Sequence, residues 1–431
     1  MTMTRRVLLA GAALALVASP PLARAQELGG VTFRGFASQG YMKSSDNRYL
    51  SVRTDEGSFA FTEVGLNLSV EPAAKLRVAS QLLARDLGVQ GNTQVVLDWG
   101  LGDYRIEDWF GVRAGRIKAP IGLYNTLTDA DVARPEILQP GGFYAAERRD
   151  VTNAVDGGGV YGTVALGGAG YLAYEALFGT LQLDETYLLT RLVREGSATL
   201  VRPLTAAGFS QLDYGVSEVT GSAKWTYTTF VEWRPPLAGL RFAFSAGGVD
   251  IDFSGLTNFT GFRAGSPAAL GVRSTFHRTT ETPQSVISGE YSRGGLRLSA
   301  EHSWNKNATS VHLQGLPFPV PDRVIVASPQ TTYGQVAYRF NDHLQLSGYY
   351  AAYYPDAEDK DGSRFVAQGQ PAHAAWSKDF AVTARVDINP HWLIKGEIHD
   401  FDGTANLSAV ENPDGTEEDW TLVLLKVTFH F

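Results

Sequence analysis

Residues 423–431, the last in the sequence, read VLLKVTFHF. The residues at odd-numbered positions in this stretch are all apolar, and those at even-numbered positions are mostly polar. Alternation with a period of two places the two sets on opposite faces of a β-strand. The stretch therefore predicts a strand that faces an apolar environment on one side and a polar environment on the other.

The start of the sequence has the features of an export signal. Arg5 and Arg6 form a charged beginning, residues 7–18 are apolar, and Ala23-Arg24-Ala25 fits a small-residue cleavage site. The apolar stretch is too short to cross the ~30 Å hydrocarbon core of a bilayer. The paired arginines also fit a twin-arginine signal, which we set aside because a membrane barrel must reach its membrane unfolded. We predict a signal peptide at residues 1–25 and a mature chain from Gln26.

The mature chain has no stretch of about 18 consecutive apolar residues, which excludes a membrane-spanning helix. A membrane-embedded chain without such helices must form a closed barrel, since lipid offers no other way to satisfy backbone polar groups. An export signal together with a terminal aromatic residue indicates a bacterial outer-membrane β-barrel. We expect Phe431 to serve as its assembly signal.

Composition narrows the functional classes. The 431-residue chain has a net charge of −8, and removal of the three signal arginines makes it more acidic, which argues against a nucleic-acid partner. Cysteine is absent, so neither a disulfide framework nor a thiolate metal site is expected. The 46 glycines and the 11% aromatic content fit an all-β chain with many turns and aromatic girdles at the membrane interfaces.

Strand-like segments of about 9–12 residues recur along the chain, the length that a tilted strand needs to cross a bilayer. Tight turns such as 71–74, 100–103, 167–169 and 293–294 alternate with loops that are mostly much longer. This alternation predicts an all-β fold: one transmembrane antiparallel β-barrel over residues 26–431, with short periplasmic turns and long extracellular loops. We predict sixteen strands, at residues 31–41, 59–70, 75–85, 92–99, 104–116, 158–166, 170–179, 223–233, 240–250, 284–292, 295–304, 331–340, 343–354, 376–387, 391–402 and 420–431.

The alternation also assigns charged side chains to the inner face, because a charge on the lipid face costs ~2–4 kcal/mol at mid-depth. Inward-facing arginines could form a basic wall that creates a transverse electric field and orients polar solutes. Alternatively, these arginines and the neighbouring acids could neutralise each other as ion pairs. Further inward-facing charges of both signs, among them Glu301, Lys395, Glu397 and Lys426, argue against strong ion selectivity. The predicted pore-lining residues near the start of the chain are Arg77, Arg85, Arg105 and Arg113, with the acids Glu63, Asp98 and Glu107.

Two segments resemble a known family. Residues 115–124, with the sequence GRIKAPIGLY, are similar to a Gly-Arg/Lys-x-Lys-x-Pro-x-Gly segment of several porin groups, including phosphate-selective ones. The first strand, VTFRGF at 31–36, and the terminal phenylalanine also look like those of general porins. The mature chain thus resembles the Gram-negative outer-membrane porins over essentially its whole length.

The resemblance implies a water-filled channel for passive diffusion of small hydrophilic solutes and ions. It further implies contact with outer-membrane lipid and lipopolysaccharide, insertion by the barrel assembly machinery, and a homotrimer. In sixteen-stranded porins the third loop folds into the barrel, and here it corresponds to residues 117–157. Its charged residues, the candidates for a constriction, are Lys118, Asp129, Asp131, Arg134, Glu136, Arg148 and Arg149.

Other interpretations of this loop and of the barrel stay open. The loop has Gln139-Pro140-Gly141-Gly142-Phe143 where general porins have an acidic signature, so an ordinary solvated loop is an alternative and trimer formation stays open. The barrel could instead be a substrate-selective channel of the anion or phosphate type, or a plugged structural or adhesive barrel. A barrel hydrolase would need a Ser-His pair on one face, but neighbouring His302 and Ser303 point to opposite faces. We therefore predict no enzyme activity, no cofactor and no metal site.

Overall fold

The structure is a computed structural model. The residues it describes are 26–28, 30–50, 52–88, 91, 93–144, 146, 149, 153–183, 208–263, 269–315, 321–408 and 411–431. The predicted signal peptide, residues 1–25, lies outside the described residues. Within them, no helix is both long and apolar enough to cross a membrane.

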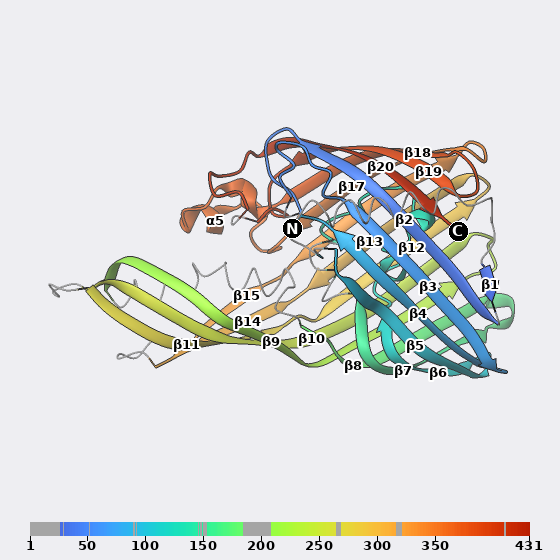
Figure 1. Cartoon of the computed structure of the whole chain (residues 1–431), viewed down its shortest axis with the longest axis horizontal. Helices are drawn as coiled ribbons and strands as arrows, with labels where there is room; N and C mark the ends of the chain where they lie inside the picture. The colour runs from blue at the N-terminus through green and yellow to red at the C-terminus, as the bar shows by residue number, and fades with distance from the viewer. Residues whose placement is uncertain are drawn as a thin grey trace.

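Sixteen strands form a closed antiparallel β-barrel, as the sequence predicts (Figure 1). Each pairs with its neighbour along the barrel, and β20 closes the ring against β2. The barrel strands are β2 (Val31–Ser44), β3 (Thr62–Ala73), β4 (Leu76–Asp86), β5 (Val95–Glu107), β6 (Phe110–Lys118), β7 (Ala154–Ala165), β8 (Tyr171–Thr180), β9 (Phe209–Arg234), β10 (Leu240–Arg263), β12 (Gln284–Arg293), β13 (Leu296–Asn305), β16 (Gln330–Arg339), β17 (Leu344–Tyr354), β18 (Ser377–Asp387), β19 (Trp392–Asp402) and β20 (Asp419–His430).

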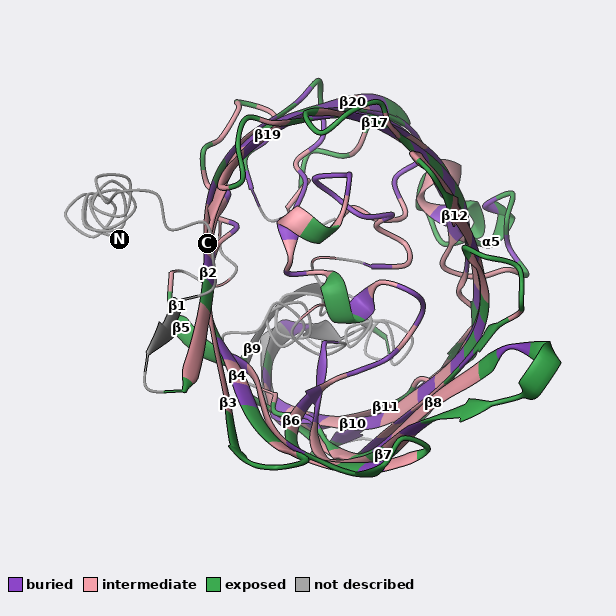
Figure 2. Ribbon diagram, turned by 90° about the vertical axis from the view of Figure 1, so that its right-hand side faces the viewer, coloured by how far each residue is buried: buried purple, intermediate pink, exposed green. Residues whose placement is uncertain are grey.

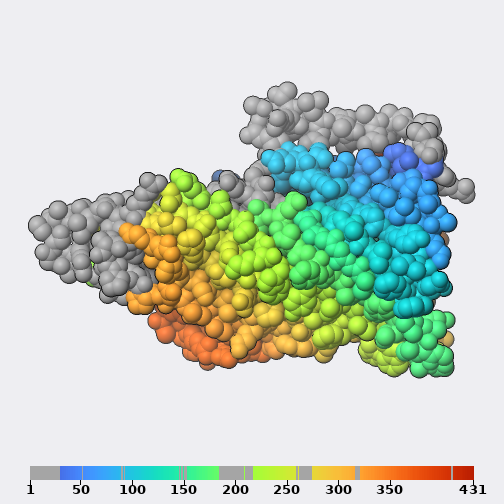
Figure 3. All heavy atoms as spheres, turned by 90° about the horizontal axis from the view of Figure 1, so that it is seen from below, coloured from blue at the N-terminus to red at the C-terminus, as the bar shows by residue number. Residues whose placement is uncertain are grey.

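Some strands continue beyond the barrel. The first half of β10 pairs with β12 inside the barrel wall, and its second half pairs with β11 (Ala269–Glu281) outside it. With β14 (Asn307–Gln314) and β15 (Arg323–Ala327), these strands form a projecting sheet (Figure 1 and Figure 3). The predicted strands leave residues 251–283 and 305–330 as loops. This prediction is wrong where β10, β11, β14 and β15 lie.

The remaining elements are short. β1 (Gln26–Leu28) pairs with the start of β2. The helical turns are η1 (Asn125–Leu127), η2 (Asp131–Ala133), η4 (Gly167–Ala169), α5 (Ser363–Ala367) and η5 (Ala372–Ala375).

One predicted turn is wrong. Residues 100–103 do not turn but lie within β5, and the chain turns at Asp108 and Trp109 instead. At this place β6 packs closely on β5: Gly115 has φ +131°, and a Cβ there would lie 2.3 Å from the carbonyl oxygen of Gly100. Glycine inside a strand often marks such a close backbone approach.

The two faces of the strands meet different environments. On β20, Val423 and Leu425 are 48% and 52% exposed on the outer face, whereas Leu424, Lys426 and Thr428 are buried on the inner face. On β19, Ile398 is exposed outside and Lys395, Glu397 and His399 are buried inside. The apolar outer belt makes this a transmembrane barrel of the kind found in bacterial outer membranes.

Phe431 lies at the seam where the barrel closes. Its backbone exchanges two hydrogen bonds with Gly35, of 3.1 and 3.0 Å, and its ring lies 2.7 Å from where a Cβ of Gly35 would be. Replacing Phe431 with Asp puts a charge where the closing strand meets lipid, so we expect a large loss of correctly inserted barrel. Heat-modifiable mobility of outer-membrane fractions measures this. The variant Phe431→Tyr keeps the ring and is the control; equal insertion of Phe431→Asp and wild type would contradict the expectation.

Candidate functional site

The third loop lies inside the barrel. It runs from residue 119, after β6, to residue 153, before β7, and Figure 2, which looks along the barrel, shows described chain crossing the interior. Near its start, the Gly122 amide donates to Ser245 Oγ on β10 (2.9 Å), and the Leu123 amide donates to Glu301 on β13 (2.8 Å). Farther on, Thr331 on β16 donates to the carbonyl of Gly142 (3.0 Å). The loop thus reaches from β6 to strands on the far wall.

The middle of the loop is held by a buried lysine. Lys395 on β19 donates to the carboxylate of Asp131 (3.0 Å) and to the carbonyls of Asp131, Arg134 and Glu136 at 2.7–3.1 Å. Lys426 Nζ lies 3.4 Å from the same carboxylate, and Thr428 donates to it at 2.7 Å. Lys395, Lys426, Thr428 and Asp131 are all at most 1% exposed. This loop clamp ties two adjacent strands of the wall to one loop carboxylate.

A second contact fixes the neighbouring residues. Glu397 on β19 accepts from the amides of Ile137 (2.6 Å) and Leu138 (2.8 Å). Glu397 also accepts from Thr383 and lies 2.8 Å from a ring nitrogen of His399, so its carboxylate is satisfied on both oxygens. Two backbone donors on one buried carboxylate give the loop a fixed path, since any other path would leave those groups without partners.

Protonation behaviour in the loop follows from the same contacts. Burial raises the pKa of Asp131, but the charges of Lys395 and Lys426 outweigh it and hold the pKa well below its usual value. Glu136 is also buried, and desolvation raises its pKa. Asp131 therefore stays ionised in mildly acidic conditions, which keeps the loop clamp charged.

The base of the loop is tied to the wall from which it leaves. Asp129 pairs with both Lys118 and Arg149, and these charges overcome its desolvation and lower its pKa. Arg149 also donates to Asp98 on β5 (2.6 Å), to which Asn153 donates as well (2.9 Å). Of the predicted loop residues, Arg148 lies outside the described residues.

The four predicted wall arginines do not form one row. Arg77 and Arg113 both contact Asp103, at 3.2 and 3.4 Å, and Arg113 also pairs with Glu175 (2.7 Å). Arg105 is exposed and lies next to the turn that ends β5, apart from Arg85 near the opposite end of β4. Of the predicted acids, Glu107 lies 3.9 Å from Lys75 near the same turn, and Glu63 pairs with Lys426 (2.6 Å).

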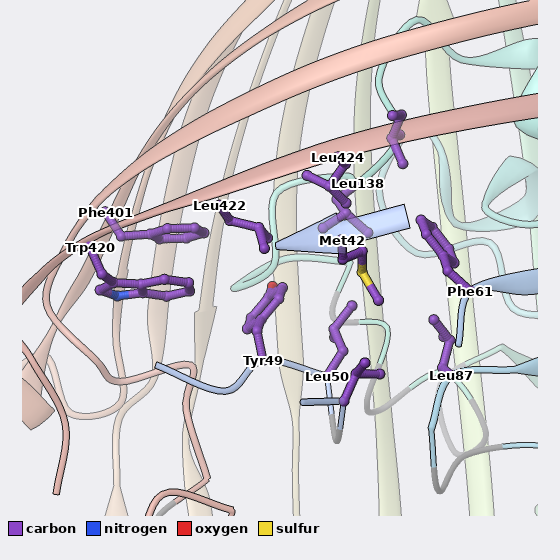
Figure 4. Close-up of a cluster of buried hydrophobic side chains, with 12 residues drawn as sticks. Met42, Tyr49, Leu50, Phe61, Leu87, Leu138, Phe401, Trp420, Leu422 and Leu424 are labelled. Atoms are coloured by element: carbon purple, nitrogen blue, oxygen red, sulfur yellow. The ribbon is translucent and has the colours of Figure 1, made fainter. Parts of the chain in front are cut away.

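Apolar side chains pack together and fill part of the barrel interior. This cluster was not expected from the sequence. The first loop, between β2 and β3, brings Tyr49 and Leu50 inward against Leu138 of the third loop. Phe401 and Trp420 stack beside them with ring centroids 4.0 Å apart (Figure 4). One sequence signal for this cluster existed: alternation places Leu422 and Leu424 on the inner face of β20 with Lys426. It did not indicate which residues they would contact. The full cluster is Met42, Tyr49, Leu50, Val52, Phe61, Leu87, Ile137, Leu138, Phe401, Trp420, Leu422 and Leu424.

A second packed group joins the loop to β13 and β16. Tyr144 and Tyr333 both donate to Glu301, which Ser288 also contacts at 2.6 Å. Phe143 packs on Tyr333 with ring centroids 5.7 Å apart. Inward-facing Glu301 was predicted from strand alternation, but its role as an acceptor for the loop was not.

Among the cavities between described residues, two lie on opposite sides of the third loop. The first, here called the charged cavity, lies toward β3 and β4 and is lined by Glu63, Arg85, Asp129, Arg134 and Arg149 among others. The second, here called the uncharged cavity, lies toward β7, β9 and β10, and no described residue that lines it is charged. Asn125 and Tyr144 line both cavities, so the loop is the partition between them.

The described residues show no metal centre: they contain no group of three or more His, Cys, Asp or Glu side chains suited to hold an ion. The loop before β18 is rich in acidic residues. Two of them, Asp356 and Glu358, form ion pairs with Arg364, at 2.9 and 3.2 Å.

Comparison with known proteins identifies the fold. No protein-family model matches the chain, and no curated protein sequence matches it. Among solved structures, OmpF of Salmonella typhi in complex with daunomycin is similar over 93% of this chain and 97% of its own, with a TM-score of 0.51 and 11% identity. An anion-selective porin from Comamonas acidovorans matches over 93% and 99% of the two chains, with a TM-score of 0.48 and 13% identity. The similarity to OmpF gives this chain the fold of Gram-negative outer-membrane porins.

Proposed function

We propose that this chain forms a water-filled channel in the bacterial outer membrane for passive diffusion of small hydrophilic solutes and ions. The observation that carries the proposal is a loop that crosses the barrel interior but leaves a cavity on each side of it. A sixteen-stranded barrel is wide enough for an aqueous interior, and an inward loop reduces it to a size-limiting passage. The proposal includes export by the signal peptide at residues 1–25, insertion by the barrel assembly machinery, contact with lipopolysaccharide, and a homotrimer.

Selectivity is expected to be weak. The charged cavity combines three arginines with two acids, and several of these groups neutralise each other in ion pairs. A passage lined by both signs attracts cations and anions to similar degrees, whereas a strong preference needs an excess of one sign.

We propose that the channel acts without catalysis. A Ser-His pair on one face would support a hydrolase, but His302 contacts Thr332 (2.7 Å) while Ser303 is buried on the other face of β13. A plugged structural barrel is the second candidate, and the apolar cluster around Leu138 and Trp420 favours it, because that cluster fills part of the interior beside the charged cavity.

Liposome swelling and planar-bilayer recording test the proposal together. We expect the purified, folded barrel to admit sugars at rates that fall with solute size, and to conduct KCl with a small reversal potential in a salt gradient. Urea-denatured protein is the control. A heat-modifiable, folded barrel that gives neither swelling nor conductance would contradict the channel and support the plugged barrel. A large reversal potential of anionic sign would support the anion-selective alternative.

A further inference from the structure

The uncharged cavity differs in chemistry from the charged cavity beside it. Its wall combines apolar side chains such as Ile121, Val155 and Phe143 with uncharged polar ones. The polar residues are Asn125, Tyr144, Thr226, Tyr227, Thr228, Thr282 and Gln284. Both cavities are bounded by the same loop, but by different residues of it. The charged cavity takes Asp129, Arg134 and Arg149 from the loop and Glu63 and Arg85 from β3 and β4, whereas the uncharged cavity is lined by uncharged loop residues and by threonine and glycine of β9 and β10.

A polar atom in the wall of the uncharged cavity has no hydrogen-bond partner among the described residues. Thr228 is 5% exposed, and its Oγ1 is buried without a hydrogen-bond partner among the described residues. The neighbouring Thr226 differs, since its hydroxyl donates to the carbonyl of Gly248 (3.1 Å). A buried hydroxyl without a partner costs free energy, and a bound solute that hydrogen-bonds to it removes that cost.

The loop comes close to the wall at one edge of this cavity. A Cβ on Gly247 would lie 3.0 Å from Cδ1 of Ile121 and 3.3 Å from Cγ2 of Thr228. Gly247 therefore keeps space open where any larger residue would press on the loop. The cavity that remains is lined by apolar side chains and by uncharged polar groups, among them Thr228.

We infer that the third loop divides the channel into two routes, and that the uncharged cavity is a route for small uncharged solutes with an apolar face and a hydroxyl group. An ion that enters it loses hydration with no charged group to compensate, which is costly in an apolar surrounding. Ions therefore pass through the charged cavity. An uncharged solute can place its apolar face against Ile121 and Phe143 and its hydroxyl against Thr228. This inference rests on the proposed channel function.

Matched substitutions on the two sides of the loop test the division. Thr228 lines the uncharged cavity and Thr128 lines the charged cavity, so Thr228→Trp and Thr128→Trp place the same indole in opposite routes. The uncharged probe is arbutin, a phenyl glucoside, whose entry is measured by liposome swelling. The ion probe is KCl conductance in planar bilayers. We expect Thr228→Trp to lose most arbutin entry and to keep most of the conductance, and Thr128→Trp to do the reverse.

The outcomes separate this inference from the channel itself. Equal losses of arbutin entry and conductance in either variant, or no loss in Thr228→Trp, would overturn the two routes while wild-type flux still supports a channel. Absence of both fluxes in the wild type would instead overturn the channel. If Thr228→Trp does not fold, Thr228→Val decides: we expect the half-saturating arbutin concentration to rise roughly fivefold, the loss of one hydrogen bond of about 1 kcal/mol. An unchanged value would overturn the inference.

Discussion

The variant Lys395→Met is expected to release the third loop and to increase single-channel conductance. Lys395 is fully buried and donates to four acceptors on the loop, including the Asp131 carboxylate. Methionine fills similar space without a donor, so it leaves a buried carboxylate with one fewer cation. Removing one partner of a buried ion pair typically costs about 3–5 kcal/mol, which is large against the stability of a docked loop.

Planar-bilayer recording measures the conductance, and limited trypsin digestion measures the exposure of Arg134. The control is the double variant Asp131→Asn with Lys395→Met, which removes both charges and so avoids an uncompensated one. We expect this double variant to recover part of the wild-type behaviour. Wild-type conductance together with a wild-type digestion pattern in Lys395→Met would show that the loop clamp does not hold the loop.

Deleting residues 126–150 is expected to increase conductance further and to raise the size limit for sugars. The deletion removes the clamped segment with Asp131 and also Tyr144, which lines both cavities. The two routes then merge into one opening. Pore resistance falls as the cross-section grows, so the increase should exceed that of Lys395→Met.

Single-channel conductance and swelling with sugars of graded size measure both effects. A deletion of residues 358–370 is the matched control, because that segment contains α5 at the outer end of the barrel (Figure 1). Its conductance should stay at the wild-type value. If deletion of 126–150 changes neither conductance nor size limit, the third loop does not limit the passage.

The sequence alone determined the barrel and the direction of its side chains. Each strand alternates apolar and polar residues because its two faces meet different environments. On β20, for example, Leu425 faces outward and Lys426 inward. The signal is local, so it does not depend on which strands are neighbours. The same alternation placed Lys395, Glu397 and Glu301 inside before any contact was known. The turn residues at 100–103 gave a wrong prediction, because this segment lies within β5.

Which partners the inward-facing groups contact depends on the tertiary structure. Lys395 meets Asp131 across 264 residues of sequence, and Glu397 meets Ile137 across 260. Such pairs are set by the register of sixteen strands and by the closure of β20 on β2, which no single segment encodes. The same holds for the partition of the interior: which loop residues and which strands line each cavity follows from the closed barrel.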